Sequence, residues 1–235
     1  MNAVQKTFWD GVKSEIPLLI GVVPFGMIYG ALALDAGLSK LASQMMSTIV
    51  FAGSAQFITA QLVAEAAPAF VIILTIAVVN LRHMLYSASL APYLKHLSIK
   101  WKVLLSYLLT DEAYAPSILH YEKEGLQKHS HWFLFGAGAT LWVSWQISTA
   151  LGIFLGTKIP DDLSLDFALP VTFIAMLVPT LKKAPAIASA LCAGIIALLT
   201  YNLPFKLGLI LAALVGITVG IVLEKQNPQR GQDGK

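Results

Sequence analysis

The chain has 235 residues, of which 57% are hydrophobic and 12% are charged, whereas charged residues make up ~25% of typical soluble domains. Its net charge of +3 is small and spread along the sequence, so the composition argues against a nucleic-acid-binding protein. With a single cysteine, Cys192, the chain can form neither an intrachain disulfide nor a cysteine metal cluster, and we predict no metal and no other cofactor.

Residues 1–15 place apolar side chains such as Phe8 and Val12 at helical spacing, with Asp10 and Glu15 between them. This pattern is typical of a short helix that lies in the membrane interface. The two acids also argue against a cleaved signal peptide, whose first region is basic. We therefore predict an interfacial helix over residues 1–15.

From residue 16 onward, the sequence consists mainly of uncharged runs, several of them near the ~20 residues that a spanning helix needs. The runs cover residues 16–34, 41–64, 66–81, 132–157, 184–205 and 207–223, and a shorter one covers 167–181. We predict an all-α integral membrane protein with about seven or eight membrane segments, several broken or half-length. They form a single transmembrane domain over residues 16–223, and a polar tail follows at 224–235.

Glycine, proline and asparagine interrupt several runs at membrane depth, where a break is tolerated only if the freed backbone faces protein or a cavity. The candidate breaks are Pro24-Phe25-Gly26, Gly53-Ser54, Asn80 to His83, Pro170, Pro179 and Asn202-Leu203-Pro204. A faint internal repeat links two of them, because one Ala-Pro pair opens the run before Asn80 and another opens the run before Asn202. Matched interrupted segments in two halves point to the site of a secondary transporter.

Two connections are basic, one with Lys95, Lys100 and Lys102 and one with Lys182-Lys183. Basic loops favour the cytoplasm, so we place both inside. Three apolar segments separate them, which requires that one segment does not cross. The stretch that Asp111 and Glu112 interrupt is the candidate for this re-entrant element.

Arg82 and His83 lie between the uncharged residues 66–81 and 84–94. A charged group in hydrocarbon costs about 2.5 to 3.5 kcal/mol on insertion scales, so it usually faces a protein interior, a water-filled cavity or a substrate path. The planar guanidinium of Arg82 can bind a substrate carboxylate through two hydrogen bonds, and His83 can carry a proton near neutral pH. The alternatives are that Arg82 extends to a lipid headgroup and that His83 only hydrogen-bonds a neighbouring helix.

Helical spacing places Arg82 on one face with Tyr86, Ser89 and Tyr93. It places Asp111 on one face with Tyr107 and Tyr114, whereas Glu112 points roughly 100° away. We predict that Asp111 lines a cavity, where it pairs with Arg82 or with a substrate ammonium, and that Glu112 faces another helix or the aqueous end. The alternative for Asp111 is a loop acid at the membrane surface.

Gly53 and Ser54 lie near the middle of the run at residues 41–64. If a helix restarts here, Ser54 caps it, and the backbone amides from residue 55 through Gln56 to Phe57 can receive an anion. A substrate carboxylate fits such a helix end. The alternative is close helix packing, because residues 52–55 are all small.

Trp142 and Trp145 lie in the middle of their run, so they do not form a simple interfacial belt. Together with Phe57 and Phe173, they are candidates for the wall of an apolar pocket. The alternative is ordinary packing of these aromatic side chains.

Three motifs carry a family resemblance: Phe51-Ala52-Gly53-Ser54-Ala55-Gln56-Phe57, Asn80-Leu81-Arg82-His83-Met84-Leu85-Tyr86 and Leu109-Thr110-Asp111-Glu112-Ala113. In order and spacing they resemble the AzlC family of branched-chain amino-acid permeases, and the similarity extends from about Pro17 to Leu223. The resemblance implies a multi-pass protein of the bacterial or archaeal plasma membrane that exports leucine, isoleucine, valine and related compounds. It also implies a small AzlD-type membrane subunit as partner.

We therefore predict a proton-coupled secondary transporter, not an enzyme, that moves branched-chain or other apolar amino acids outward through the lipid bilayer. The predicted substrate-binding residues are Ser54, Gln56, Arg82, Tyr86 and Asp111. The predicted proton-coupling residues are His83, Asp111 and Glu112, and the predicted pocket residues are Phe57, Trp142, Trp145 and Phe173. Two alternatives stay open: an intramembrane enzyme that uses Asp111, Glu112 and His83, and a channel or structural membrane subunit.

Overall fold

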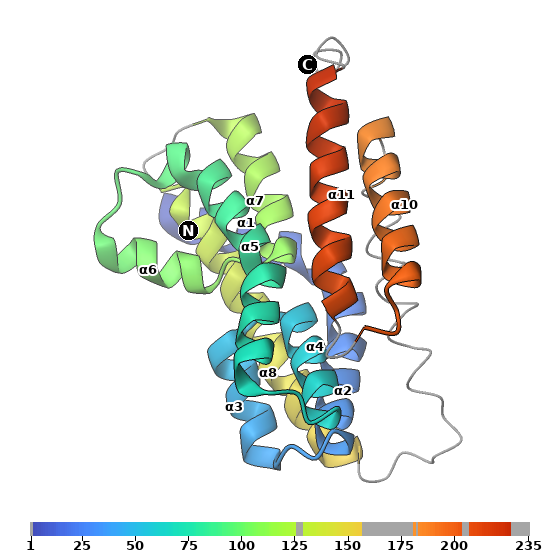
Figure 1. Cartoon of the computed structure of the whole chain (residues 1–235). Coiled ribbons are helices and arrows are strands. Elements are labelled where there is room, and N and C mark those ends of the chain that lie inside the picture. The colour runs from blue at the N-terminus through green and yellow to red at the C-terminus, as the bar shows by residue number, and fades with distance from the viewer. Residues whose placement is uncertain (1, 126–128, 157–180, 182, 204–206, 227–235) are drawn as a thin grey trace. The chain divides into compact units, whose positions relative to one another are not determined.

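The computed structural model describes residues 2–125, 129–156, 181, 183–203 and 207–226 (Figure 1). These residues form helices and turns without any strand, which confirms the predicted all-α fold. The chain divides into two compact units, one with residues 1–66 and 79–166 and the other with residues 67–78 and 167–235. Four described segments are long and apolar enough to cross a membrane, namely Ala3–Asp35, Ala69–Leu94, His131–Gly156 and Leu207–Gln226.

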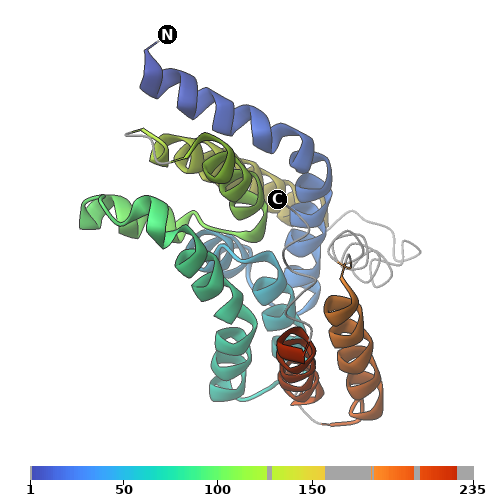
Figure 2. The same cartoon turned by 90° about the horizontal axis from the view of Figure 1, so that it is seen from above.

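The first unit is built on a pair of long helical segments. One segment consists of α1 (Ala3–Glu15), the short 3₁₀ turn η1 (Ile16–Leu18) and α2 (Leu19–Asp35), and the other is α8 (His131–Gly156). α1 and α2 both pack along α8, and the two segments run in the same direction. We predict a separate interfacial helix for residues 1–15, whereas in the structure α1 lies against α8 and continues into α2, as the blue and yellow ribbons in Figure 2 show.

Glycines on both segments bring the two backbones into direct contact. A Cβ atom on Gly11 would overlap the carbonyl oxygen of Phe133, and one on Gly30 would overlap that of Thr149. In the reverse sense, a Cβ on Gly152 would overlap the carbonyl oxygen of Met27. Small residues allow membrane helices to approach this closely, and the gain in dispersion contacts stabilises the pair. α2 also continues through Pro24, so the predicted break at Pro24-Phe25-Gly26 is wrong.

The run at residues 41–64 forms a helical hairpin. α3 (Lys40–Val50) runs antiparallel to α8, because Lys40 lies over the ring of Phe154 while Thr48 hydrogen-bonds Gln146. The chain reverses at Phe51, which has the left-handed φ of 41°, and α4 (Gly53–Ala64) returns along α2. The sequence predicts a spanning segment with a break at Gly53-Ser54; the break is present, but the chain turns back there.

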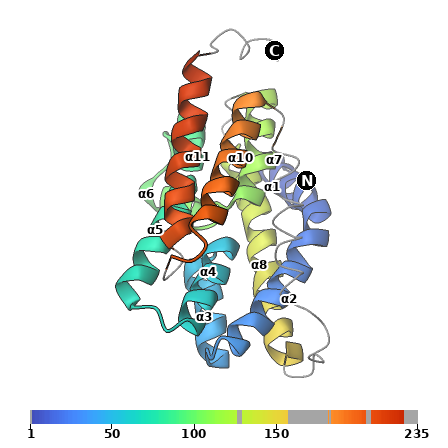
Figure 3. The same ribbon diagram turned by 45° about the vertical axis from the view of Figure 1, so that its right-hand side comes forward.

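The stretch around Asp111 forms a second hairpin, which enters from the opposite end of α8. α6 (Ile99–Tyr107) runs alongside α8, and Trp101 contacts Phe135 near the start of α8. α7 (Asp111–Glu124) runs back, and the Tyr121 hydroxyl donates to the carbonyl of Ser130. Figure 3 shows α7 with α1 at one end of α8, and α3 and α4 with α2 at the other. The stretch therefore folds back on itself, as a re-entrant element would, and its placement in the membrane stays a prediction.

A single helix, α5 (Ala69–Leu94), connects the two hairpins. The predicted break at Asn80 to His83 is therefore wrong, and so is the predicted repeat that pairs this break with the one at Asn202. From residue 79 on, α5 belongs to the first unit. Its predicted polar face is confirmed, because Ser89 hydrogen-bonds Tyr114 and Tyr93 contacts Tyr121 on α7.

In the second unit, α10 (Ala184–Leu199) packs against α11 (Leu207–Gln226). The Ser189 hydroxyl donates to the carbonyl oxygen of Gly216 at 2.6 Å, so this pair also meets at a small residue. α10 ends before Asn202, which confirms an interruption there. Pro170 and Pro179 lie outside the described residues.

Candidate functional site

Arg82 joins the tips of the two hairpins. Its Nη1 atom lies 3.1 Å from Oδ2 of Asp111 at the start of α7, and its Nη2 atom donates to the Ser54 hydroxyl, 2.7 Å away, at the start of α4. The Arg82 and Asp111 side chains are 29% and 26% exposed. Both side chains are therefore only partly buried. The predicted pairing of Arg82 with Asp111 is confirmed.

Each hairpin tip places a helix N-terminus at this ion pair. α7 begins at Asp111, and its cap is Thr110, whose hydroxyl accepts from the amide of Ala113. α4 begins at Gly53 with Ala52 as its cap, so the predicted capping role of Ser54 is wrong. The Ser54 side chain instead bonds Arg82, and the first amides of α4 remain oriented to the tip. The partial positive charge of both helix ends favours carboxylates here, which is consistent with Asp111 in the first turn of α7.

The two tips also touch through aromatic side chains. The rings of Phe51 and Tyr107 lie 5.9 Å apart, and the Tyr107 hydroxyl donates to the carbonyl oxygen of Thr48. Trp142 on α8 donates to the same hydroxyl at 2.7 Å. Trp142 therefore holds the α6–α7 tip against α3 and α8. Because α6 ends at Tyr107, this residue does not share a helix face with Asp111 as predicted.

Tyr86 and His83 extend the site along α5. The ring of Tyr86 stacks on that of Tyr114, with centroids 4.6 Å apart, and His83 meets the edge of Tyr86 at 6.0 Å. Ser89 holds the Tyr114 hydroxyl at 2.9 Å. These contacts form an aromatic wall one helical turn from Arg82.

Glu112 follows Asp111 but has a different environment. Burial raises the pKa of Glu112 above its ordinary value, and the neighbouring Asp111 carboxylate raises it further. Asp111 has the Arg82 guanidinium as a counter-ion, whereas Glu112 forms no salt bridge among the described residues. Glu112 therefore takes up a proton more readily than an exposed glutamate does.

Gln56, Phe57 and Trp145 form a buried cluster beside the α4 tip. Trp145 donates to Oε1 of Gln56 at 3.1 Å, and Phe57 stacks on Phe25 with ring centroids 4.5 Å apart. Both Gln56 and Phe57 are fully buried. Their side chains pack against neighbouring rings, so their roles in substrate binding remain predictions. Phe173 lies outside the described residues.

A polar network between α3 and α8 was not predicted. Gln44 and Thr48 both donate to Oε1 of Gln146, at 2.8 and 2.9 Å, and Ser47 hydrogen-bonds Thr149 at 2.9 Å. These side chains recur at helical spacing within two apolar runs, and that spacing is the signal that could have revealed them. The network fixes the first hairpin to α8.

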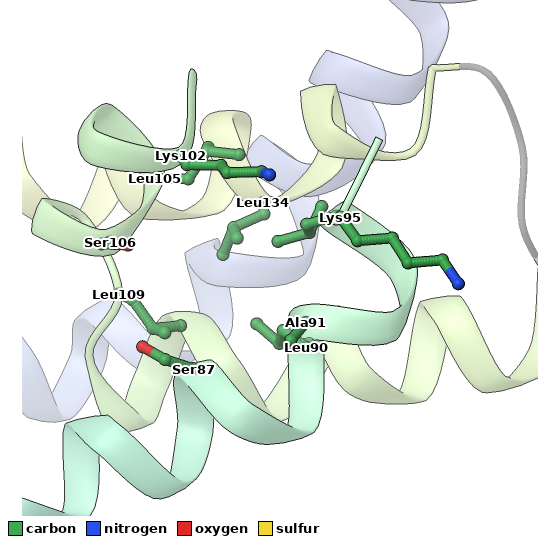
Figure 4. Close-up of a pocket in the computed structure, with 10 residues that line it drawn as sticks. Ser87, Leu90, Ala91, Lys95, Lys102, Leu105, Ser106, Leu109 and Leu134 are labelled. Carbon is green, nitrogen blue, oxygen red and sulfur yellow. The ribbon is translucent and has the colours of Figure 1, made fainter. Parts of the chain in front are cut away.

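A cavity of about 270 Å³ lies between α5, α6 and α8 (Figure 4). Leucines dominate its lining, which consists of Ser87, Leu90, Ala91, Leu94, Lys95, Lys102, Leu105, Ser106, Leu109 and Leu134. Ser87 lies one turn after His83 on α5, and Leu109 lies two residues before Asp111. The cavity therefore borders the second hairpin tip.

Comparisons with known proteins agree with these motifs. The family model described as AzlC protein matches residues 17–159. The chain is 27% identical to the inner membrane protein YgaZ of Escherichia coli over 91% of this chain and 88% of the relative. It is 29% identical to an uncharacterized membrane protein of Archaeoglobus fulgidus, over 92% of this chain and 96% of the relative.

A further relative is the branched-chain amino acid transport protein AzlC of Bacillus subtilis. It is 28% identical over 77% of this chain and 71% of the relative. No solved structure shows significant similarity to the chain.

Proposed function

This chain belongs to the AzlC family, and from that membership and the geometry around Arg82 we propose that it is a proton-coupled secondary transporter that exports branched-chain or related apolar amino acids. It is a multi-pass membrane protein, and its relatives include a branched-chain amino acid transport protein. The observation that carries the proposal is the Arg82 side chain, which binds the tips of two opposed hairpins at once.

The ion pair is complementary to both ends of an amino acid. A substrate carboxylate would bind the guanidinium of Arg82 through two hydrogen bonds, with the Ser54 hydroxyl and the first amides of α4 beside it. The substrate ammonium would form a charge-assisted hydrogen bond with the Asp111 carboxylate. The zwitterion thus replaces each internal partner by a group of the same charge, so binding leaves neither Arg82 nor Asp111 as an unpaired charge in the membrane.

The opposed hairpins supply a way to open this site to one side at a time. The α3–α4 hairpin enters from one end of α8 and the α6–α7 hairpin from the other. Binding sites between discontinuous helices at mid-depth are typical of secondary transporters. In our proposal, movement of the α7 tip away from Arg82 opens the site toward the cavity beside Leu109, and movement of the α4 tip opens it toward the other end.

Transport itself is tested by measuring the flux of radiolabelled leucine in proteoliposomes, with and without an imposed proton gradient. We expect leucine flux that the gradient accelerates, and that unlabelled isoleucine and valine inhibit. Empty liposomes are the control. Flux that ignores the gradient would favour the channel alternative, and absence of flux with the partner present would contradict the proposal.

We also propose that a small AzlD-type membrane subunit completes the transporter. The resemblance supports this partner, as do the half-length helices of the first unit, each of 9 to 14 residues. The flux assay is therefore run with this chain alone and with the small subunit added. Equal flux in both arms would contradict the need for a partner.

Glu112 is proposed to contribute to proton coupling, together with His83. Because the pKa of Glu112 is raised, the carboxyl group is protonated at low pH and ionises as the pH rises through the raised value. We expect wild-type leucine flux to fall over that rise in pH, whereas Glu112→Gln, which stays neutral, should lose this pH dependence. Glu122→Gln on the same helix serves as the control. An unchanged pH profile in Glu112→Gln would contradict the role.

A further inference from the structure

Glu15 is a buried acid with no partner in the described part of the chain. It is the last residue of α1, its exposed fraction is 0%, and neither carboxyl oxygen has a hydrogen-bond partner among the described residues. An ionised carboxylate in such a place is very unfavourable, so the group persists only as the neutral acid or with a ligand. Ionisable side chains within membrane segments usually serve a function.

The packing of α1 on α8 places Glu15 at the depth of the hairpin tips. Gly11 lies against the backbone of Phe133 and Ala137. The two helices run in parallel, so Glu15, one turn further along, is level with the turn of α8 that follows Ala137. Gly138 in that turn contacts Leu108, which begins the second hairpin tip. Glu15 is thus buried at the level of the second hairpin tip, the tip that carries Asp111.

Among the described residues, no charged side chain pairs with Glu15. The helices packed on α1 are α7 and α8. Their ionisable groups among the described residues are Asp111, Glu112, Tyr114, His120, Tyr121, Glu122, Lys123 and Glu124 on α7 and His131 on α8, and α1 itself carries Lys6, Asp10 and Lys13. None of them forms a hydrogen bond or an ion pair with Glu15 in the described part of the chain.

We propose that Glu15 is a proton-binding site of this protein, an inference that rests on the proposed transport function. In the state described here, Glu15 holds its proton as a neutral carboxylic acid. When the α6–α7 tip moves away from α8 and water enters, the O–H bond breaks, the proton passes to water, and the hydrated carboxylate remains. Return of the tip requires that Glu15 first takes up a proton, which links hairpin movement to protonation.

The first test reads the proton directly. The purified full chain in lipid nanodiscs is titrated while infrared spectra record the C=O stretch of protonated carboxyl groups. At neutral pH we expect a band that is lost in Glu15→Gln and kept in Asp10→Asn, the matched control on the same helix. If Glu15→Gln does not fold, Glu15→Asp should shift the band instead. Absence of any band that depends on residue 15 would overturn the proposal.

The second test measures the coupling of leucine flux to the proton gradient. In proteoliposomes, Glu15→Gln should still exchange labelled for unlabelled leucine, but a proton gradient should no longer accelerate its net flux, whereas Asp10→Asn should behave as wild type. Gradient-driven flux that persists in Glu15→Gln would overturn the role. Loss of leucine flux in the wild type would instead contradict the proposed function, and the infrared band would still decide whether Glu15 binds a proton.

Discussion

Arg82→Ala should lower leucine flux by ~30-fold or more. Truncation of one member of a hydrogen-bonded, partly buried charge pair costs about 2 to 5 kcal/mol, and each 1.4 kcal/mol corresponds to about tenfold. Here the change removes the substrate's carboxylate ligand, separates the two hairpin tips and leaves Asp111 without a counter-ion. Arg82→Lys should recover part of the flux, because it restores the charge but not the two-pronged geometry.

Asp111→Asn tests the other half of the same site. We expect a comparable loss of flux, since the neutral amide can form an ion pair neither with Arg82 nor with a substrate ammonium. The matched control is Lys100→Ala, which removes an exposed charge from α6 and should leave flux unchanged. If Arg82→Ala and Asp111→Asn together leave leucine flux at the wild-type level, the proposed roles of both residues are refuted.

Gly30→Ala should destabilise the protein severely. The new Cβ would overlap the backbone of Thr149 and Ile153, and backbone atoms cannot rotate away as a flexible side chain can. Overpacking of this kind typically costs about 1 to 3 kcal/mol. We expect a loss of stability of about 3 kcal/mol, because two helices must separate. The measurement is the melting temperature of the purified protein in detergent.

Gly21→Ala is the matched control for this prediction. Gly21 lies on the same helix as Gly30, but a Cβ built there meets no atom of another described segment within 4 Å. Alanine favours the helix by up to about 1 kcal/mol over glycine, so the melting temperature should stay the same or rise. Equal melting temperatures for Gly30→Ala and Gly21→Ala would show that the parallel helix pair is not packed as described.

The charged side chains within apolar runs were the part of the site that could be predicted from the sequence. Arg82 and Asp111 stand out because hydrocarbon tolerates neither group without a partner or water. The re-entrant stretch at Asp111 was predicted on different grounds, because the two basic connections lie on the same side only if one of the three segments between them does not cross. Periodicity identified the face of α5 that Arg82 shares with Tyr86, because this helix is regular.

Other features left no distinct signal in the sequence. The run at residues 41–64 is uncharged and long enough to span, so nothing in its composition indicates that it turns back at Phe51, a non-glycine residue with a positive φ. Asn80 suggested a break that α5 does not have, because a single amide within a helix does not disrupt the backbone hydrogen bonds. Glu15 resembled a surface acid, because helical spacing on α1 cannot reveal that α8 covers it.

The parallel helix pair also has a consequence for biogenesis. The most extensive packing in the first unit joins α2 to α8, which the ribosome completes only after both hairpins and α5 have been synthesised. The hairpins therefore leave the translocon before the surface that holds them exists. We expect nascent chains that end before α8 to be sensitive to quality-control proteases. We also expect the first unit to fold late and in one step, when α8 inserts beside α2.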